Sequence, residues 1–135
     1  MEKIVVNPPG LAKAIGYSHG FEVKGGRLLF LSGEVAFDKQ GSIVGRGEIV
    51  AQFRQVCENL KTIVEDRGGT LQDVVKLTIF ILDREDYKAK GKAIGQVYRD
   101  YFGRHYPAMS LIEVKGLYHE AEGVMIEIEG IAVLP

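Results

Sequence analysis

Two glutamates, Glu127 and Glu129, lie in the apolar stretch of residues 124–134. Because side chains of a β-strand alternate between its two faces, both carboxylates share a face with Met125 and Ile131. An ionised carboxylate on an apolar face requires solvent, hydrogen bonds, an ionic partner or a shifted pKa. Glu127 and Glu129 are therefore the first candidates for general acid/base chemistry.

Other residue types that often do chemistry are sparse. Cys57 is the only cysteine, which excludes an intramolecular disulfide and leaves a cysteine-based zinc site without ligands. Its position on a helical apolar face predicts an inert core thiol. The three histidines, His19, His105 and His119, lack the HxH or HxxxH spacing of metal sites. The sequence thus predicts no metal site.

Composition and length favour one globular domain over residues 1–135. With 46% hydrophobic and 26% charged residues, the chain is able to bury a core and is unlike a disordered segment. Its formal net charge of −1, without a basic stripe, argues against nucleic acid as the main partner. The chain shows neither a signal-peptide pattern nor a long apolar run, so we expect a cytoplasmic protein with no membrane partner.

The glycine pair Gly25-Gly26 predicts a turn between two strands. Residues 21–24 and 27–31 flank it, a pattern typical of a two-residue β-hairpin. The second strand ends at Ser32-Gly33-Glu34, and a polar segment around residues 38–41 leads towards the first helix.

Two amphipathic helices are predicted. Residues 48–66 place apolar side chains at the i, i+3, i+4 and i+7 positions of a helix. Asp83 is a typical N-cap for the second helix. The apolar stripe of that helix includes several aromatic residues, Tyr87, Tyr98, Tyr101 and Phe102. Gly91 and Gly95 inside it indicate a close contact, a break in the helix or simple tolerance.

Residues 74–82, 109–114 and 124–134 are the remaining predicted strands. The order ββαβαββ predicts a two-layer α+β fold, with a mixed β-sheet and both helices on one face. Apolar residues remain on the other face of the sheet, and they predict association into a closed homo-oligomer.

The element order and five short segments together resemble the RidA/YjgF family of reactive-intermediate imine/enamine deaminases. These segments are Ile15–Gly20, Leu31–Gly33, Asn59–Val64, Pro107-Ala108 and Ile126–Ala132. Their order and spacing match the family across nearly the whole chain. The resemblance implies a chorismate-mutase-like fold, a homotrimer and a ligand cleft between neighbouring subunits.

Active members of this family hydrolyse 2-imino or 2-enamino acids to keto acids and ammonia without a cofactor. The resemblance implies that Glu127 is the catalytic glutamate and that Tyr17, Ser32 and Gly33 bind the substrate. Glu129 is left as a structural partner for a basic side chain on an adjacent strand or subunit.

Three other substrate-binding positions carry different residues here. The arginine that clamps the substrate carboxylate in the family falls on Met109, an asparagine on Gly95 and a frequent cysteine on Leu111. A guanidinium binds a carboxylate through two charge-assisted hydrogen bonds that a thioether cannot make, so this cleft should prefer a less anionic or more apolar ligand. An arginine from elsewhere in the chain could supply the missing charge: Arg27, Arg84 or Arg104.

The sequence therefore leaves two functions open. The first is a cofactor-independent hydrolytic deaminase of imine or enamine intermediates, acting on a substrate other than simple 2-imino acids. The second is a non-catalytic trimeric protein that uses the same cleft to bind or sense a small molecule. A ribonuclease function, sometimes attached to this family, is disfavoured by the near-neutral charge.

Overall fold

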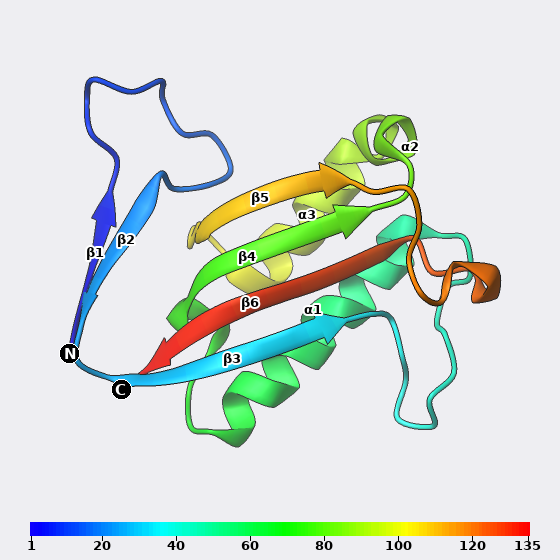
Figure 1. The fold of residues 1–135 in the computed structure, drawn as a ribbon, viewed down its shortest axis with the longest axis horizontal. Coiled ribbons are helices and arrows are strands. Elements are labelled where there is room, and N and C mark those ends of the chain that lie inside the picture. The colour runs from blue at the N-terminus through cyan, green and yellow to red at the C-terminus, as the bar shows by residue number, and fades with distance from the viewer.

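The computed structural model describes residues 1–135 and contains strands, three α-helices and two short 3₁₀ turns at Leu71–Asp73 and Glu120–Glu122 (Figure 1). The elements are, in order, β1 (Glu2–Val6), β2 (Gly20–Lys24), β3 (Arg27–Glu34), α1 (Ile49–Asp66), β4 (Val74–Ile81), α2 (Arg84–Ala89), α3 (Gly91–Phe102), β5 (Ala108–Glu113) and β6 (Ile126–Leu134). No helix combines the length and the apolar character needed to cross a bilayer.

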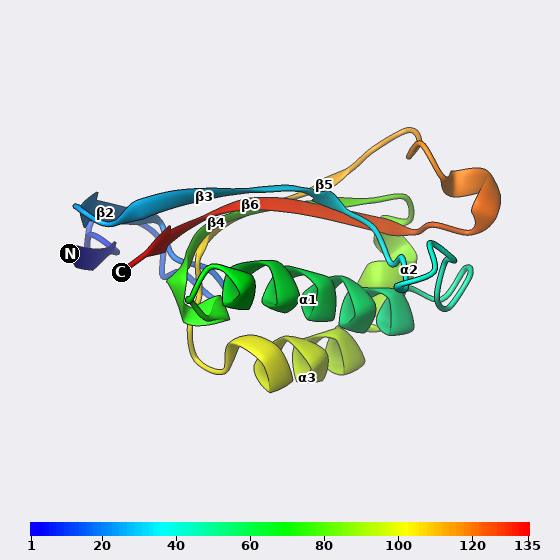
Figure 2. The ribbon, with the colours of Figure 1, turned by 90° about the horizontal axis from the view of Figure 1, so that it is seen from below.

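The main sheet has four strands in the order β3-β6-β4-β5. Strand β4 runs parallel to β5, whereas β6 is antiparallel to both of its neighbours, so the sheet is mixed. Helices α1 and α3 lie on the same side of it, and its other face is uncovered (Figure 2). The predicted two-layer α+β fold is confirmed.

The core lies between this sheet and α1. One face of α1 buries a row of apolar side chains, namely Ile49, Phe53, Val56, Cys57, Leu60 and Val64. Burial raises the pKa of the Cys57 thiol to about 12, which agrees with the predicted inert core role.

A single buried amide joins α1 to two loops. The Gln52 side chain is fully buried, and its Nε2 donates to the carbonyls of Gly45 at 2.9 Å and Gly123 at 2.6 Å. Its Oε1 accepts from the backbone N–H of Met125 at 2.8 Å. Gln52 thereby fixes the entrance of β6, the strand that carries Glu127.

The predicted hairpin at Gly25-Gly26 is wrong. Strand β2 pairs with β1, a strand that the sequence analysis did not predict, and β3 pairs with β6. The two glycines have φ of 79° and 82°, as a tight turn requires, but here they direct the chain from a two-stranded sheet into the main sheet. Lys3 of β1 ties the small sheet to Asp73 through a 2.6 Å salt bridge.

The predicted second helix is divided in two. The backbone leaves the helical conformation at Lys90, and α3 begins at Gly91. Of the three explanations offered for the glycines, a break applies at Gly91. A close contact applies at Gly95, where an added Cβ would lie 3.3 Å from Nη1 of Arg99. Asp83 caps α2 as predicted, accepting from the backbone N–H of Asp86 at 3.0 Å.

The uncovered face of the sheet is partly apolar. Leu28 and Phe30 of β3 are 65% and 70% exposed, and Ile112 of β5 is 42% exposed. Burying such side chains against another protein surface is favourable by about 1.5–3 kcal/mol for each large residue. Within one chain nothing covers this face, so the expected oligomer remains a prediction.

Candidate functional site

Glu127 lies on the uncovered face of the sheet, against Gly33. The register of β6 puts Glu127 beside Phe80 of β4 on one side, while β3 runs along the other. The Glu127 carboxylate occupies the space that a side chain at residue 33 would fill, because an added Cβ there would overlap Oε2 and lie 3.0 Å from Cδ. Gly33 therefore lets this half-buried carboxylate lie over the backbone of β3.

A β-bulge brings Ser32, Gly33 and Glu34 to this place. Leu31 pairs with Gly130 and Glu34 pairs with Ile128, so β3 contains one residue more than its partner between the two pairs. Such a bulge changes the direction of side chains without ending the strand. Ser32 is exposed, and it directly precedes Gly33, the residue over which the Glu127 carboxylate lies.

Glu34 is a second carboxylate of this group that the sequence analysis missed. Burial, and then the negative charge of Glu127, raise the pKa of Glu34 above its ordinary value of 4.5. Both causes make it harder to ionise Glu34 than a carboxyl group in water. Glu129, by contrast, is exposed and lies opposite Thr78.

The other four predicted residues line a cleft on the helical side of the sheet. Tyr17, Met109 and Leu111 border one cavity of about 350 Å³. Met109 also borders an adjoining cavity of about 350 Å³ that reaches Gly95 on α3. The two cavities share five residues, Ile15, Gly16, Ile79, Tyr87 and Met109, so we describe them together as the β5–α3 cleft.

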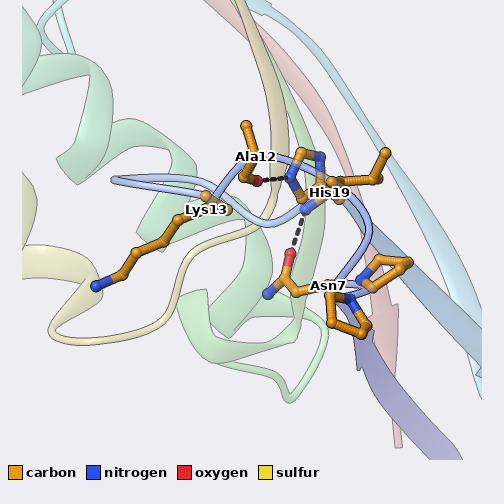
Figure 3. A pocket seen from close by; sticks show the side chains of 8 residues that line it. Asn7, Ala12, Lys13 and His19 are labelled. Atoms are coloured by element: carbon orange, nitrogen blue, oxygen red, sulfur yellow. Dashed lines mark hydrogen bonds between the residues drawn. The ribbon is translucent and has the colours of Figure 1, made fainter.

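The loop that carries Tyr17 is held by His19. The His19 ring Nε2 lies 2.6 Å from the carbonyl of Ala12, and its backbone N–H donates to Asn7 Oδ1 at 2.7 Å (Figure 3). These contacts close a loop around a hollow of about 420 Å³. The Lys13 side chain points away from His19. The Tyr17 ring stands edge-on to His19, with centroids 5.4 Å apart. His19 thus serves to position Tyr17.

The same loop is joined to the edge strand of the sheet. The backbone N–H of Ser18 donates to the carbonyl of Pro107 at 3.1 Å, and its hydroxyl donates to the carbonyl of Tyr106 at 2.6 Å. Ser18 is buried. The predicted Tyr17 and Met109 are therefore brought together by hydrogen bonds from Ser18, the next residue after Tyr17, to the two residues Tyr106 and Pro107 that lie shortly before Met109.

Two tyrosines of the cleft, Tyr87 and Tyr98, are partly buried. Burial raises the pKa of both Tyr87 and Tyr98. The Tyr98 hydroxyl donates to the carbonyl of His105 at 2.5 Å, so Tyr98 forms a fixed wall of the cleft. Both rings were expected to be core residues, and they pack on the core with one side while they line the cleft with the other.

The predicted site residues thus form two groups. Ser32, Gly33 and Glu127 lie on the uncovered face of the sheet, and Glu34 follows them at the bulge, opposite Ile128. Tyr17, Gly95, Met109 and Leu111 lie along the β5–α3 cleft on the helical side. The alternation of buried Ile126 and Ile128 with Glu127 on β6 keeps the two groups apart within one chain. No group of three histidine, cysteine or acidic side chains is placed to hold a metal ion.

None of the three arginines considered from the sequence borders the β5–α3 cleft. Arg27 donates to the carbonyls of Pro135 and Arg67, each at 3.2 Å. Arg84 lies 3.6 Å from Glu85, and Arg104 follows the end of α3. The cation that does border the cleft is Arg99. Its spacing of four residues from Gly95 was the available signal, since these positions share one face of a helix.

Comparison with known proteins gives consistent matches over the whole fold. The family model described as endoribonuclease L-PSP matches residues 10–134. A RutC family protein of Pyrococcus horikoshii is 39% identical over 131 residues, covering 96% of this chain and 97% of that protein. A solved structure of the conserved Rid protein family, YyfB from Yersinia pestis, has a TM-score of 0.87 and 34% identity, with coverage of 99% and 100%. RidA from an Antarctic Psychrobacter has a TM-score of 0.68 and 31% identity, with coverage of 91% and 92%.

Proposed function

This chain belongs to the RidA/YjgF family, whose model is described as endoribonuclease L-PSP, and from that premise we propose that it is a cofactor-independent imine/enamine deaminase. The observation that carries the proposal is the position of Glu127. Its carboxylate lies over Gly33, beside a second carboxyl group, Glu34, whose pKa is raised. A half-buried carboxylate held against the backbone in this way is placed to act as a general base in the hydrolysis of a C=N bond.

In the proposed reaction, Glu127 moves protons between water and nitrogen. Its carboxylate removes a proton from water as the water oxygen bonds to the C=N carbon, and it delivers that proton to the imine nitrogen to give a carbinolamine. It then moves the hydroxyl proton of the carbinolamine to the amino nitrogen. The C–N bond breaks, and ammonia and a carbonyl product are released.

The proposed active unit is a homotrimer. Glu127 and Tyr17 lie on opposite sides of the sheet within one chain, so a site that contains both needs residues of two chains. The exposed apolar side chains Leu28 and Phe30 lie on the same face as Glu127, where a neighbouring subunit would cover them. In this arrangement the β5–α3 cleft of one subunit faces the Glu127 group of the next.

The direct test is ammonia release from imines and enamines generated in situ by a dehydratase, together with bulkier enamine substrates. We expect acceleration with at least one bulky or apolar substrate, and we expect Glu127→Gln to abolish it while the melting temperature stays close to that of the unmodified protein. If no substrate is hydrolysed faster than in buffer, the deaminase proposal is wrong.

Mixed oligomers test whether two chains share a site. Glu127→Gln and Tyr17→Ala should each be inactive alone. In an equimolar random mixture, about one quarter of the sites would pair an intact Glu127 with an intact Tyr17 from the next chain. Recovery of about a quarter of the activity is expected. A mixture as inactive as its components would exclude a shared site.

A second function is favoured by one observation, the presence of Met109 in the cleft. A chain that had lost the carboxylate clamp could bind a small molecule without transforming it. In that case the unmodified protein would bind apolar ligands and hydrolyse no imine. RNA cleavage, suggested by the description of the family model, is disfavoured by the net charge of −1, and binding of RNA that survives moderate salt would be required to support it.

A further inference from the structure

We propose that Arg99 is the anion-binding residue of the β5–α3 cleft, and that the ligand carries its anionic group at the α3 wall, separated by an apolar segment from the reacting end. This inference rests on the proposed function for the identity of the reacting group, but the binding of the anion does not. Met109 cannot bind an anionic group of the ligand, and the inference assigns this role to Arg99.

The geometry of α3 brings the Arg99 guanidinium to the cleft. Gly91, Gly95 and Arg99 follow one another at intervals of four residues and therefore form one stripe of the helix. Long side chains on a helix lean towards its N-terminus, so Arg99 extends over the turn at Gly95. Its Nη1 lies 3.3 Å from the place where a Cβ of residue 95 would be. Glycine at this position leaves the room that the guanidinium uses.

The charge of Arg99 is available to a ligand. Its one hydrogen bond to another side chain is a 3.3 Å contact from Nη2 to Gln96 Oε1, a neutral acceptor. The adjacent acid, Asp100, forms its salt bridge with Arg54 at 3.1 Å. A guanidinium with free donors binds a carboxylate through two parallel charge-assisted hydrogen bonds. Arg99 is solvent-exposed, so it lies at the open side of the cleft.

The other residues that line the cleft indicate what the rest of the ligand would be. Beyond Arg99 the cleft is lined by Ile79 of β4, Met109 of β5 and the half-buried ring of Tyr87. These surfaces fit an apolar or aromatic body. A 2-imino acid has its carboxylate on the carbon next to the C=N group, as a clamp at residue 109 would require. A clamp on α3 instead selects an imine or enamine whose carboxylate lies farther along an apolar chain or ring.

Phenylacetate and its neutral amide, phenylacetamide, are suitable binding probes for calorimetric titration. We expect the unmodified protein to bind phenylacetate, and Arg99→Gln to weaken that binding about tenfold or more, as the loss of a charged hydrogen bond predicts. Binding of phenylacetamide should not depend on residue 99. Arg104→Gln, which removes a cation near the end of the same helix but outside the cleft, should bind phenylacetate like the unmodified protein.

A second variant tests the role of the glycine. Gly95→Asn adds a side chain whose Cβ would lie 3.3 Å from the Arg99 guanidinium, so it should displace this group and weaken phenylacetate binding more than phenylacetamide binding; an equal effect on both ligands would argue against the proposed role of Arg99. The inference is overturned if Arg99→Gln binds phenylacetate normally, if Arg104→Gln loses as much affinity as Arg99→Gln, or if the unmodified protein does not bind phenylacetate at millimolar concentration.

Ammonia release, measured in parallel, separates this inference from the proposed function. Binding that depends on Arg99 in a protein without deaminase activity would refute the enzyme and retain the anion site. Deaminase activity on a carboxylate substrate that persists unchanged in Arg99→Gln would refute the anion site and retain the enzyme.

Discussion

Substitution of Gly33 by alanine should move the Glu127 carboxylate while changing the stability of the fold very little. The φ of Gly33 is not in the left-handed region, so alanine fits the backbone without strain. The added Cβ would overlap Glu127 Oε2 and would stand 3.0 Å from Cδ and 3.3 Å from Cγ. Non-bonded heavy atoms prefer separations of about 3.5–4.0 Å, and the oxygen is the closest of the three atoms, so the carboxyl group must move by roughly 1 Å or more.

A displacement of this size predicts a large loss of activity and a small change in stability. A catalytic group misplaced by about 1 Å can cost about 100-fold in rate. The group that moves is the end of a flexible side chain, and alanine lowers the entropy of the unfolded chain, so the free energy of unfolding should change by less than about 1 kcal/mol. We therefore expect kcat/KM of Gly33→Ala to fall about 100-fold at nearly constant stability.

The assay combines kinetics, urea denaturation and an NMR titration of the Glu34 carboxyl group. When Glu127 moves away, its charge acts less on Glu34, so the raised pKa of Glu34 should fall towards 4.5. Gly10→Ala is the matched control, because Gly10 has no atom within 4 Å of an added Cβ and no positive φ. Full activity in Gly33→Ala together with an unchanged Glu34 pKa would refute the reasoning.

Three other substitutions make separate predictions. Folding raises the pKa of Glu34, so ionising this group costs more in the folded protein than in the unfolded chain. The unmodified protein should therefore lose stability relative to Glu34→Gln as the pH rises from about 4.5 through the raised pKa. Urea denaturation at several pH values measures this difference. Gln52→Met leaves the backbone N–H of Met125 without a partner, while the carbonyls of Gly45 and Gly123 each keep one backbone donor, so unfolding should become easier by about 1–3 kcal/mol, and a loss below about 0.5 kcal/mol would argue against these hydrogen bonds. Met109→Arg should raise kcat/KM for small 2-imino acids by about tenfold or more, since it supplies a charge beside the reacting carbon; an unchanged rate would place the substrate carboxylate elsewhere.

Periodicity predicted those parts of the fold that local patterns determine. The stripe of α1, the Asp83 cap and the face of Glu127 follow from side-chain spacing, and each was correct. Strand pairing does not follow from it. Gly25-Gly26 has the chemistry of a hairpin turn, but which strand lies beside β3 depends on long-range contacts with β6.

The candidate site shows the same division. The resemblance identified Glu127 and Met109 as site positions, but it did not predict that they lie on opposite sides of the sheet in one chain. Glu34 was missed because a bulge changes the register of β3 by one residue, and a bulge has no reliable pattern in a single sequence. Arg99 was missed because its position depends on the absence of a side chain four residues earlier.

The separation of the two residue groups across the sheet has a consequence for how activity responds to dilution. In a trimer that joins them, a dissociated subunit would keep its fold and its ligand-lining residues but would contain no complete site. Specific activity would then fall at protein concentrations where spectroscopic measures of folding remain constant. The cell could regulate such a protein through its abundance, because assembly rather than folding would be the event that creates the catalyst.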